Sequence, residues 1–455
     1  MKSLLEKHRL EYKPKIPHIS TPQPIPVHTT LSHLFPYLSK APKLPPKPHP
    51  RVGVVFSGGP AAGGHNVIGA LFDHIGPLVG FLDGPAGILT NSTKPLNRAD
   101  IDPVRNQGGF DLLGSGRDKI ETPEQLSAAL RTVQQHKLDA LVVIGGDDSN
   151  TNAAVLAEYF LAHKAPVQVI GIPKTIDGDL RSPEIEISFG FDSACKTYGE
   201  LIGNVARDAV SSRKYYHFIK LMGRSASHIA LECALATQPN LVLISEEKKP
   251  LKHIVSEITD LIRRRAAAGK NYGIVLIPEG LVEFVPDLQE SVPHLEHDAH
   301  GNLAVSQIET EKLLVDLVQK QIPFQAQTHF FGYEGRCCLP SNFDANYTYG
   351  LGVSAAEALR SGLTGIICGM RHMHKSPEEW LPTFTPLVNL LHLEVRKGKE
   401  KPVIAKALVD LHGKPYKALT QHRKRWELDD LYLQPGPIQF FGPSEITDSC
   451  PLIIS

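Results

Sequence analysis

The sequence has few cysteines, no net charge and no long apolar run. Its six cysteines include no C-x-x-C pair and are too sparse for a disulfide framework, so we expect reduced thiols in a cytoplasmic protein. Lys and Arg total 48, as do Asp and Glu, and this balance argues against nucleic acid or an anionic membrane as the main partner. No run approaches the roughly 18 apolar residues of a membrane span, and the N-terminus lacks the apolar core of a signal peptide.

The 21 histidines do not form a convincing metal site. His294, His297 and His300 are three residues apart, but the sequence around them is polar and typical of a loop. We therefore expect a solvated loop over residues 283 to 306 rather than a structural metal site.

The length of the chain predicts more than one domain, because 455 residues exceed what one ordinary core supports. Residues 1 to 50 contain 11 of the 36 prolines and should form an extended arm packed on the body or on a partner subunit. Beyond the arm, strand, charged loop and helix repeat, as in a doubly wound α/β protein. We expect residues 51 to 190, joined by about 336 to 390, to form one domain, 191 to 335 a second, and 391 to 455 a C-terminal segment packed on the body.

Two apolar runs within residues 141 to 180 end in loops rich in glycine and charge. Each run is typical of a buried strand, and a helical pattern separates them, so the strands should be neighbours in a parallel sheet. Both loops then emerge at the same edge of the sheet, where α/β proteins place their chemistry. We interpret the stretch as a metal-assisted phosphate site. Its charged residues are Asp147, Asp148, Lys174, Asp177 and Asp179.

The carboxylates of these loops suit phosphoryl transfer, which needs a cation to bridge donor oxygens and a base for the acceptor hydroxyl. Asp147 follows a Gly-Gly turn and is placed as a magnesium ligand. Asp177 is the candidate general base, and Asp179 would orient it or hold a metal-bound water. The alternative, in which the acids merely cap the following helices, suits one loop alone better than two adjacent loops.

A glycine-dense turn follows the first predicted strand, Arg51 to Phe56, and reads Ser57-Gly-Gly-Pro-Ala-Ala-Gly-Gly. A strand-to-helix turn of this kind presents backbone N–H groups to an anion. It is neither a Walker A loop nor a Rossmann fingerprint. Because glycine also serves tight turns and close packing, a purely structural turn stays open as an alternative.

Five motifs follow one another along the chain: Gly-Gly-Asp147-Asp148-Ser, Pro-Lys174-Thr-Ile-Asp177-Gly-Asp179, Met222-Gly-Arg224, Pro-Glu279-Gly and Gly-Tyr333-Glu-Gly-Arg336. In this order they resemble the signature motifs of the phosphofructokinase superfamily, and specifically its pyrophosphate-dependent members of the long type. The similarity covers essentially the whole chain. The resemblance implies a phosphofructokinase-like α/β fold of two Rossmann-like three-layer domains, with the active site in the cleft between them. It also implies magnesium-dependent phosphoryl transfer from pyrophosphate to C1 of fructose 6-phosphate, by a homodimer or other homo-oligomer.

The resemblance further implies roles for individual residues. Gly58 and Lys174 would bind pyrophosphate and Asp147 would hold Mg²⁺, all in the domain of residues 51 to 190. Asp177 would be the base, with Asp148, Lys174 and Arg224 completing the catalytic set. The sugar phosphate would be bound by Thr175, Ile176, Asp177, Met222, Gly223, Arg224, Glu279, Tyr333, Glu334, Gly335 and Arg336, mostly in the second domain. Lys214 and Tyr215 match positions that are contributed across a dimer interface in the family.

The choice of phosphoryl donor depends on two of these positions. ATP-dependent relatives have glycine where Asp148 and Lys174 stand here. A carboxylate at position 148 would fill the space of a nucleotide α-phosphate, and at about 4 Å and an effective dielectric near 20 it would repel it by roughly 4 kcal/mol. Lys174 would place an ammonium against the transferring phosphoryl group. An ATP-dependent kinase of the same fold and a non-catalytic regulatory paralogue are the two alternatives.

Overall fold

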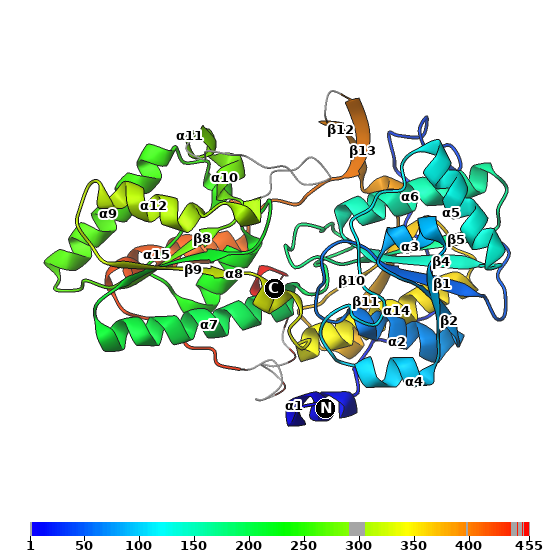
Figure 1. The fold of residues 1–455 in the computed structure, drawn as a ribbon, viewed down its shortest axis with the longest axis horizontal. Helices are drawn as coiled ribbons and strands as arrows, with labels where there is room; N and C mark the ends of the chain where they lie inside the picture. The colour runs from blue at the N-terminus through cyan, green and yellow to red at the C-terminus, as the bar shows by residue number, and fades with distance from the viewer. Residues whose placement is uncertain are drawn as a thin grey trace.

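The computed structural model describes residues 2–290, 305–396, 399–437, 444, 448 and 450–454. Two α/β lobes lie side by side, each built on its own sheet (Figure 1). The predicted α/β fold is confirmed. None of the helices in these ranges combines the length and apolar character that a bilayer span requires. The histidines at 294, 297 and 300 lie outside the described residues.

The large lobe is organised around a seven-stranded sheet with the order β11-β10-β5-β4-β1-β2-β3. The five inner strands are parallel, and β3 and β11 pair antiparallel at the two edges. Strands β1, β4 and β5 are buried along their whole length, which explains their uninterrupted apolar sequences. The strands are β1 (Val52–Phe56), β2 (Leu78–Phe81), β3 (Thr93–Leu96), β4 (Ala140–Gly145), β5 (Gln168–Pro173), β10 (Ile366–Arg371) and β11 (Leu381–Pro386).

The three central strands of this sheet end level with one another. Strand β4 pairs with β5 from Ala140 opposite Gln168 to Gly145 opposite Pro173, and β1 pairs with β4 on its other side. The prediction that the strands of residues 141 to 180 are parallel neighbours is therefore confirmed. As a result, the loops after β1, β4 and β5 emerge together at one edge.

Helices cover both faces of the large sheet, which gives this lobe three layers (Figure 1). Residues of α2 and α14 share one apolar cluster with Val54, whereas residues of α5 and α6 share a second cluster with Val55. Successive residues of β1 therefore point into opposite cores. The helices of the lobe are α2 (Gly64–Ile75), α3 (Pro85–Thr90), α4 (Arg98–Ile101), α5 (Pro123–Gln135), α6 (Asp147–Ala162) and α14 (Asn342–Arg360).

The small lobe contains a four-stranded parallel sheet with the order β7-β8-β6-β9. Its strands are β6 (Tyr216–Leu221), β7 (Leu241–Val242), β8 (Gly273–Pro278) and β9 (Ala326–Phe331). Its helices are α7 (Phe191–Ser212), α8 (His228–Thr237), α9 (Leu251–Ala267), α10 (Leu281–Phe284), α11 (Pro286–Glu290), α12 (Thr310–Gln319), α13 (Tyr333–Arg336) and α15 (Lys414–Leu428).

The loop predicted for residues 283 to 306 is wrong in its first part. Helices α10 and α11 cover most of residues 281 to 290, because Val285 and Leu288 are buried in the apolar cluster of the small lobe. Residues 291–304 lie outside the described ranges. Short 3₁₀ turns complete the fold: η1 (Leu38–Lys40), η2 (Asp102–Val104), η3 (Ser245–Glu247), η4 (Val305–Gln307), η5 (Pro377–Glu379), η6 (Leu387–Asn389) and η7 (Leu452–Ile454).

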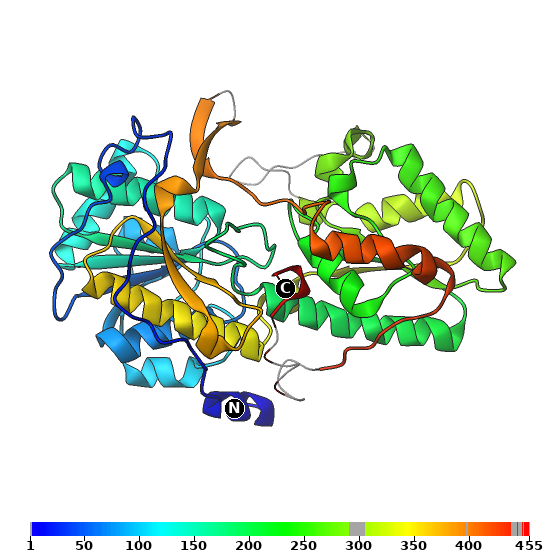
Figure 2. The same ribbon diagram turned by 180° about the vertical axis from the view of Figure 1, so that it is seen from behind.

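The C-terminal part of the chain connects the lobes. The hairpin of β12 (Leu391–Arg396) and β13 (Lys399–Ile404) projects from the large lobe, and the chain then runs back to α15 of the small lobe (Figure 1 and Figure 2). On the way, the Ala407 N–H donates to the Asp179 carbonyl at 2.7 Å, and the Val409 N–H donates to Glu246 Oε1 at 2.9 Å. This crossing is hydrogen-bonded to both lobes.

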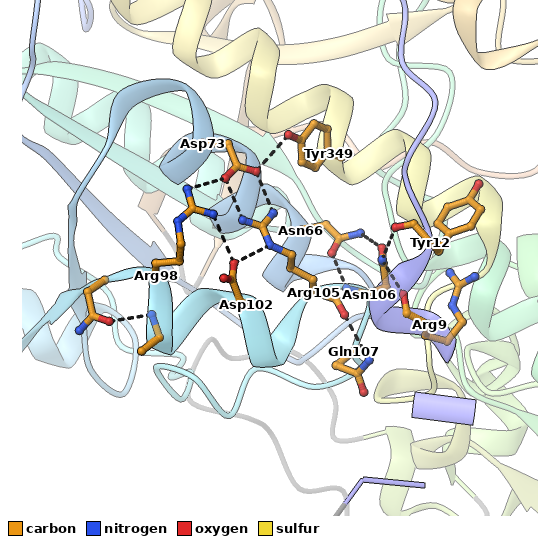
Figure 3. Close-up of polar contacts among 12 residues, drawn as sticks. Arg9, Tyr12, Asn66, Asp73, Arg98, Asp102, Arg105, Asn106, Gln107 and Tyr349 are labelled. Atoms are coloured by element: carbon orange, nitrogen blue, oxygen red, sulfur yellow. Dashed lines mark hydrogen bonds and ion pairs between the residues drawn. The ribbon is translucent and has the colours of Figure 1, made fainter. Parts of the chain in front are cut away.

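The N-terminal arm begins with a helix, α1 (Leu4–Glu11), that the proline-rich composition did not predict. Ser3 and Glu6 form a capping box that stabilises its first turn. Figure 3 shows the Asn106 amide donating to the carbonyls of Arg9 and Tyr12, at 2.8 and 2.9 Å. The arm is therefore attached to the large lobe by hydrogen bonds to its backbone.

Candidate functional site

A cavity of about 460 Å³ lies where the two sheets direct the carboxyl ends of their strands toward each other. Loops after β1, β4 and β5 line one side, and loops after β6, β8 and β9 line the other. Open α/β sheets place ligand sites at these strand ends. The predicted site residues among its lining are Gly58, Asp147, Asp148, Lys174, Thr175, Ile176, Asp177, Met222, Arg224, Glu279, Tyr333 and Arg336.

Two predicted substrate-binding residues lie far from this lining within the chain. Lys214 is exposed and Tyr215 half-buried, and both precede β6, whereas Met222 of the cavity follows the same strand. The length of the strand separates them from the cavity. A single chain therefore does not bring Lys214 and Tyr215 to the site.

Three other predicted residues support the site without lining it. The Gly223 N–H donates to Glu279 Oε2 at 3.0 Å. Glu334 is exposed, and its Oε2 accepts from a backbone N–H of its own turn. Gly335 is buried against the ring of Tyr198, where a Cβ would lie 2.6 Å from a ring atom. We interpret all three as residues that shape the loops.

The glycine turn after β1 brings two cations close to its backbone. Gly58 has φ +86°, and a Cβ there would lie 3.1 Å from Lys174 Nζ. A Cβ at Gly59 would lie 2.8 Å from a guanidinium nitrogen of Arg336. The glycines are thus needed for conformation and for the approach of positive charge, which favours a phosphate loop over a purely structural turn.

Lys174 is a buried cation, with only 5% of its surface exposed. Burial lowers the pKa of its ammonium to about 8, and the neighbouring Asp177 carboxylate opposes that shift. Lys174 consequently remains mostly protonated at pH 7. From the start of the loop after β5, its side chain therefore brings a positive charge to the glycine turn.

Burial and neighbouring carboxylates raise the pKa of two acids of the site, Asp177 and Asp179. Burial raises the pKa of Asp177, and Asp147 adds to the effect while Arg224 and Lys406 oppose it. Burial also raises the pKa of Asp179 well above its usual range, and the nearby Asp177 and Asp147 add to it. A divalent cation at this cluster would relieve the repulsion.

Magnesium fits the residues present. The described residues contain no group of three or more His, Cys, Asp or Glu side chains arranged to hold a metal. Magnesium, however, commonly uses one or two carboxylates together with substrate phosphates. Asp147 is half-buried at the start of α6 and lines the cavity, so it is the candidate ligand.

Glu279 provides a polar group on the small-lobe side. Burial raises the pKa of its carboxyl to about 7. One oxygen accepts from Gly223, and the other, Oε1, is buried without a hydrogen-bond partner among the described residues. That oxygen is available to a ligand hydroxyl.

Several lining residues were missed by sequence reasoning. Arg117 and Lys119 line the cavity, and they follow a second cluster, Gly114-Ser-Gly, whose glycine-and-charge pattern could have identified them. Lys406 influences the pKa of Asp177 and Asp179 from the C-terminal crossing. No local pattern identifies Lys406, because only the tertiary fold brings it to the site.

Comparison with known proteins identifies the family. Residues 51–359 match the phosphofructokinase family, and the chain belongs to that family. It is 42% identical to the pyrophosphate–fructose 6-phosphate 1-phosphotransferase of Porphyromonas gingivalis, over 98% of this chain and 97% of that protein. It is 47% identical to the beta 2 subunit of the Arabidopsis thaliana enzyme of the same name, over 86% of this chain and 80% of the relative.

Solved structures support the fold. A crystal structure of pyrophosphate-dependent phosphofructokinase from Nitrosospira multiformis superimposes with a TM-score of 0.63, covering 88% of this chain and 95% of that one. At 17% identity this similarity concerns the fold alone.

Proposed function

We propose that this protein is a pyrophosphate-dependent phosphofructokinase, which transfers a phosphoryl group reversibly between pyrophosphate and the C1 hydroxyl of fructose 6-phosphate. The observation that carries the proposal is the position of Asp148 and Lys174 together in the cavity, beside the glycine turn. Relatives over 40% identical across the chain, named for this activity, support it.

The donor would lie against the large lobe. The N-terminal end of α6 would present backbone N–H groups to its phosphates. Lys174 reaches the glycine turn and would neutralise charge on the transferring group. Asp147 would hold Mg²⁺, which supplies further charge neutralisation when bound.

The acceptor would lie against the small lobe, between Arg224 and Glu279. Asp177 would take the proton of the C1 hydroxyl as that oxygen forms its bond to phosphorus and the bond to the departing phosphate breaks. The phosphate of the sugar would pair with Arg224 and Arg336, and Glu279 Oε1 would accept from a sugar hydroxyl.

Two alternatives remain for experiment to separate. An ATP-dependent kinase of the same fold would have to accommodate a nucleotide beside the Asp148 carboxylate. A non-catalytic paralogue would lack the base or the metal ligand, whereas Asp177 and Asp147 are both present. The test is a coupled assay of fructose 1,6-bisphosphate formation with each donor in turn. Turnover with pyrophosphate and little with ATP is expected, and the reverse preference would contradict the proposal.

The assembly and location belong to the same proposal. Lys214 and Tyr215 would complete the sugar site of a second copy in a homodimer, which accounts for their distance from the cavity of their own chain. We place the enzyme in the cytoplasm because all six cysteines are free thiols. Analytical ultracentrifugation at micromolar concentration tests whether the protein is a dimer. If the site is shared, the Lys214→Met variant should have a higher KM for fructose 6-phosphate than the wild type.

A further inference from the structure

The segment of residues 115–120 is fastened at its start to the glycine turn. The Gly58 N–H donates to the Gly116 carbonyl at 2.8 Å, and Ser115 Oγ donates to the Gly58 carbonyl at 2.6 Å. Both bonds are made to the backbone of Gly58, which lines the cavity on the side proposed for the phosphoryl donor. The segment therefore moves with the turn that is proposed to hold phosphate.

The same segment is fastened at its end to α6. The Asn152 side chain accepts from the Ile120 N–H at 3.2 Å and donates to the Ile120 carbonyl at 2.7 Å. Ile120 itself is fully buried. Lys119, the preceding residue, is consequently held beside the first turn of α6, which carries Asp147 and Asp148.

Lys119 pairs with the carboxylate that is proposed to select the donor. Its Nζ lies 3.4 Å from Asp148 Oδ1, and both side chains line the cavity. On its outer side Lys119 is 3.7 Å from Glu121, whose carboxylate also binds Lys401 of strand β13 at 2.8 Å. The ammonium thus lies between the donor side of the cavity and a surface ion pair.

A carboxylate in a pyrophosphate site creates an electrostatic problem. Asp148 disfavours a nucleotide α-phosphate, but its charge repels every phosphate donor, including pyrophosphate with its high negative charge. A nearby cation that neutralises the charge of Asp148 would reduce this repulsion of pyrophosphate. Lys119 is such a cation, because its Nζ lies 3.4 Å from Asp148 Oδ1 and both side chains line the cavity.

We propose that Lys119 is a donor-specificity residue that acts as a charge pair with Asp148. The carboxylate excludes nucleotides, and the ammonium restores attraction for inorganic pyrophosphate, and for inorganic phosphate in the reverse reaction. This inference rests on the proposed function.

Lys119 and Lys174 serve different ends of the donor. Lys174 is buried, and its Nζ would lie 3.1 Å from a Cβ at Gly58, which places it against the glycine turn where the transferred group is proposed to bind. Lys119 has 27% of its side chain exposed and pairs with Asp148 instead. Loss of Lys119 should therefore weaken binding of the donor far more than it slows the chemical step.

The experiment uses the full-length chain and the variant Lys119→Met. We expect the KM for pyrophosphate, and for inorganic phosphate in reverse, to rise about 10- to 100-fold, with kcat and the KM for fructose 6-phosphate changed less than about threefold. Lys119→Arg should keep the KM for pyrophosphate near that of the wild type. Lys94→Met is the matched control, since it removes a lysine of the same lobe that pairs with Asp100 at 2.8 Å outside the cavity.

A double-mutant cycle tests the pairing itself. In the Asp148→Asn background, the added effect of Lys119→Met on the KM for pyrophosphate should be at least several-fold smaller than in the wild type. Additive effects, or an unchanged KM for pyrophosphate in Lys119→Met, would overturn the inference alone if the wild type uses pyrophosphate. A wild-type enzyme that uses ATP and not pyrophosphate would overturn the proposed function, and the inference with it. Thermal unfolding of each variant confirms that it is folded.

Discussion

At the scale of single residues, Lys174 is buried and Asp177 is half-buried, and each of these opposite charges opposes the pKa shift that burial imposes on the other. Neither would be stable alone, because an isolated buried charge is costly. Their mutual dependence means that neutralising one alters the other. Substitutions at either position should therefore be isosteric where the chemistry is to be tested.

Asp177→Asn should lower kcat by about 10²- to 10⁴-fold, because the amide cannot accept the proton of the C1 hydroxyl. The variant should still bind fructose 6-phosphate, which calorimetry measures without turnover. Asp260→Asn removes an exposed carboxylate of α9 and serves as the control. A near-normal kcat in Asp177→Asn would assign the base to another residue.

Asp148→Gly should shift the donor preference toward ATP. The roughly 4 kcal/mol of repulsion that the carboxylate exerts at short range would correspond to about 1000-fold. Because its side chain is 22% exposed, solvent screens part of that charge, and a shift of about 10- to 100-fold in the ratio of kcat/KM values is expected. The ratio is measured with both donors at saturating sugar phosphate. An unchanged ratio would refute the role given to Asp148.

At the scale of elements, the turn after β1 combines a backbone requirement with a contact requirement. Gly58→Ala should destabilise the protein by about 1 kcal/mol through its positive φ, and should also raise the KM for pyrophosphate about tenfold by displacing the Lys174 ammonium. Gly269→Ala is the matched control, because Gly269 has φ +74° and no atom within 4 Å of an added Cβ. Denaturation and kinetics of both variants separate the two effects. Equal KM values for pyrophosphate in the two variants would contradict the proposed contact between position 58 and the Lys174 ammonium.

The part of the candidate site that could be predicted from the sequence consists of the charged loops that directly follow buried apolar strands. Asp147 and Lys174 each end a run whose burial and spacing are local properties, and the right-handed crossover then places them together. Lys119 follows the glycine-and-charge cluster Gly114-Ser-Gly, but its ion pair with Asp148 is a tertiary contact that no local pattern predicts. Lys406 has no local signature, since its position on the crossing between the lobes depends on tertiary packing. Helix α1 was missed because proline-rich surroundings concealed its Ser3 and Glu6 capping box.

At the scale of the whole molecule, the α/β class was predictable from the repeated strand, loop and helix pattern. The way the C-terminal tail is held was not, because it depends on a buried carboxyl of the small lobe. Glu232 of α8 accepts from the N–H groups of Leu452 and Ile453 at 2.9 and 3.1 Å. Burial raises the pKa of this carboxyl to about 7, despite those two hydrogen bonds.

The pH dependence of stability should reveal this group. Because its folded pKa lies above the unfolded value near 4.5, Glu232 contributes stability that is present below pH 4.5 and lost as pH rises through 7. Between pH 5 and pH 8 the free energy of unfolding of Glu232→Gln should therefore improve relative to the wild type by on the order of 2 kcal/mol. Any cost of the amide facing the two N–H groups is the same at both pH values. A constant difference between the two proteins would contradict the raised pKa.

The path of the chain through the large sheet also sets an order for synthesis. Strand β5 is buried between β4 and β10, yet β10 begins at Ile366, after every strand of the small lobe has been made. During synthesis, the small lobe can therefore fold while the edge of β5 that will pair with β10 still has unpaired backbone N–H and C=O groups. Such an edge invites pairing with another chain. The growing polypeptide should therefore be most prone to wrong pairing until β10, which ends at Arg371, has emerged.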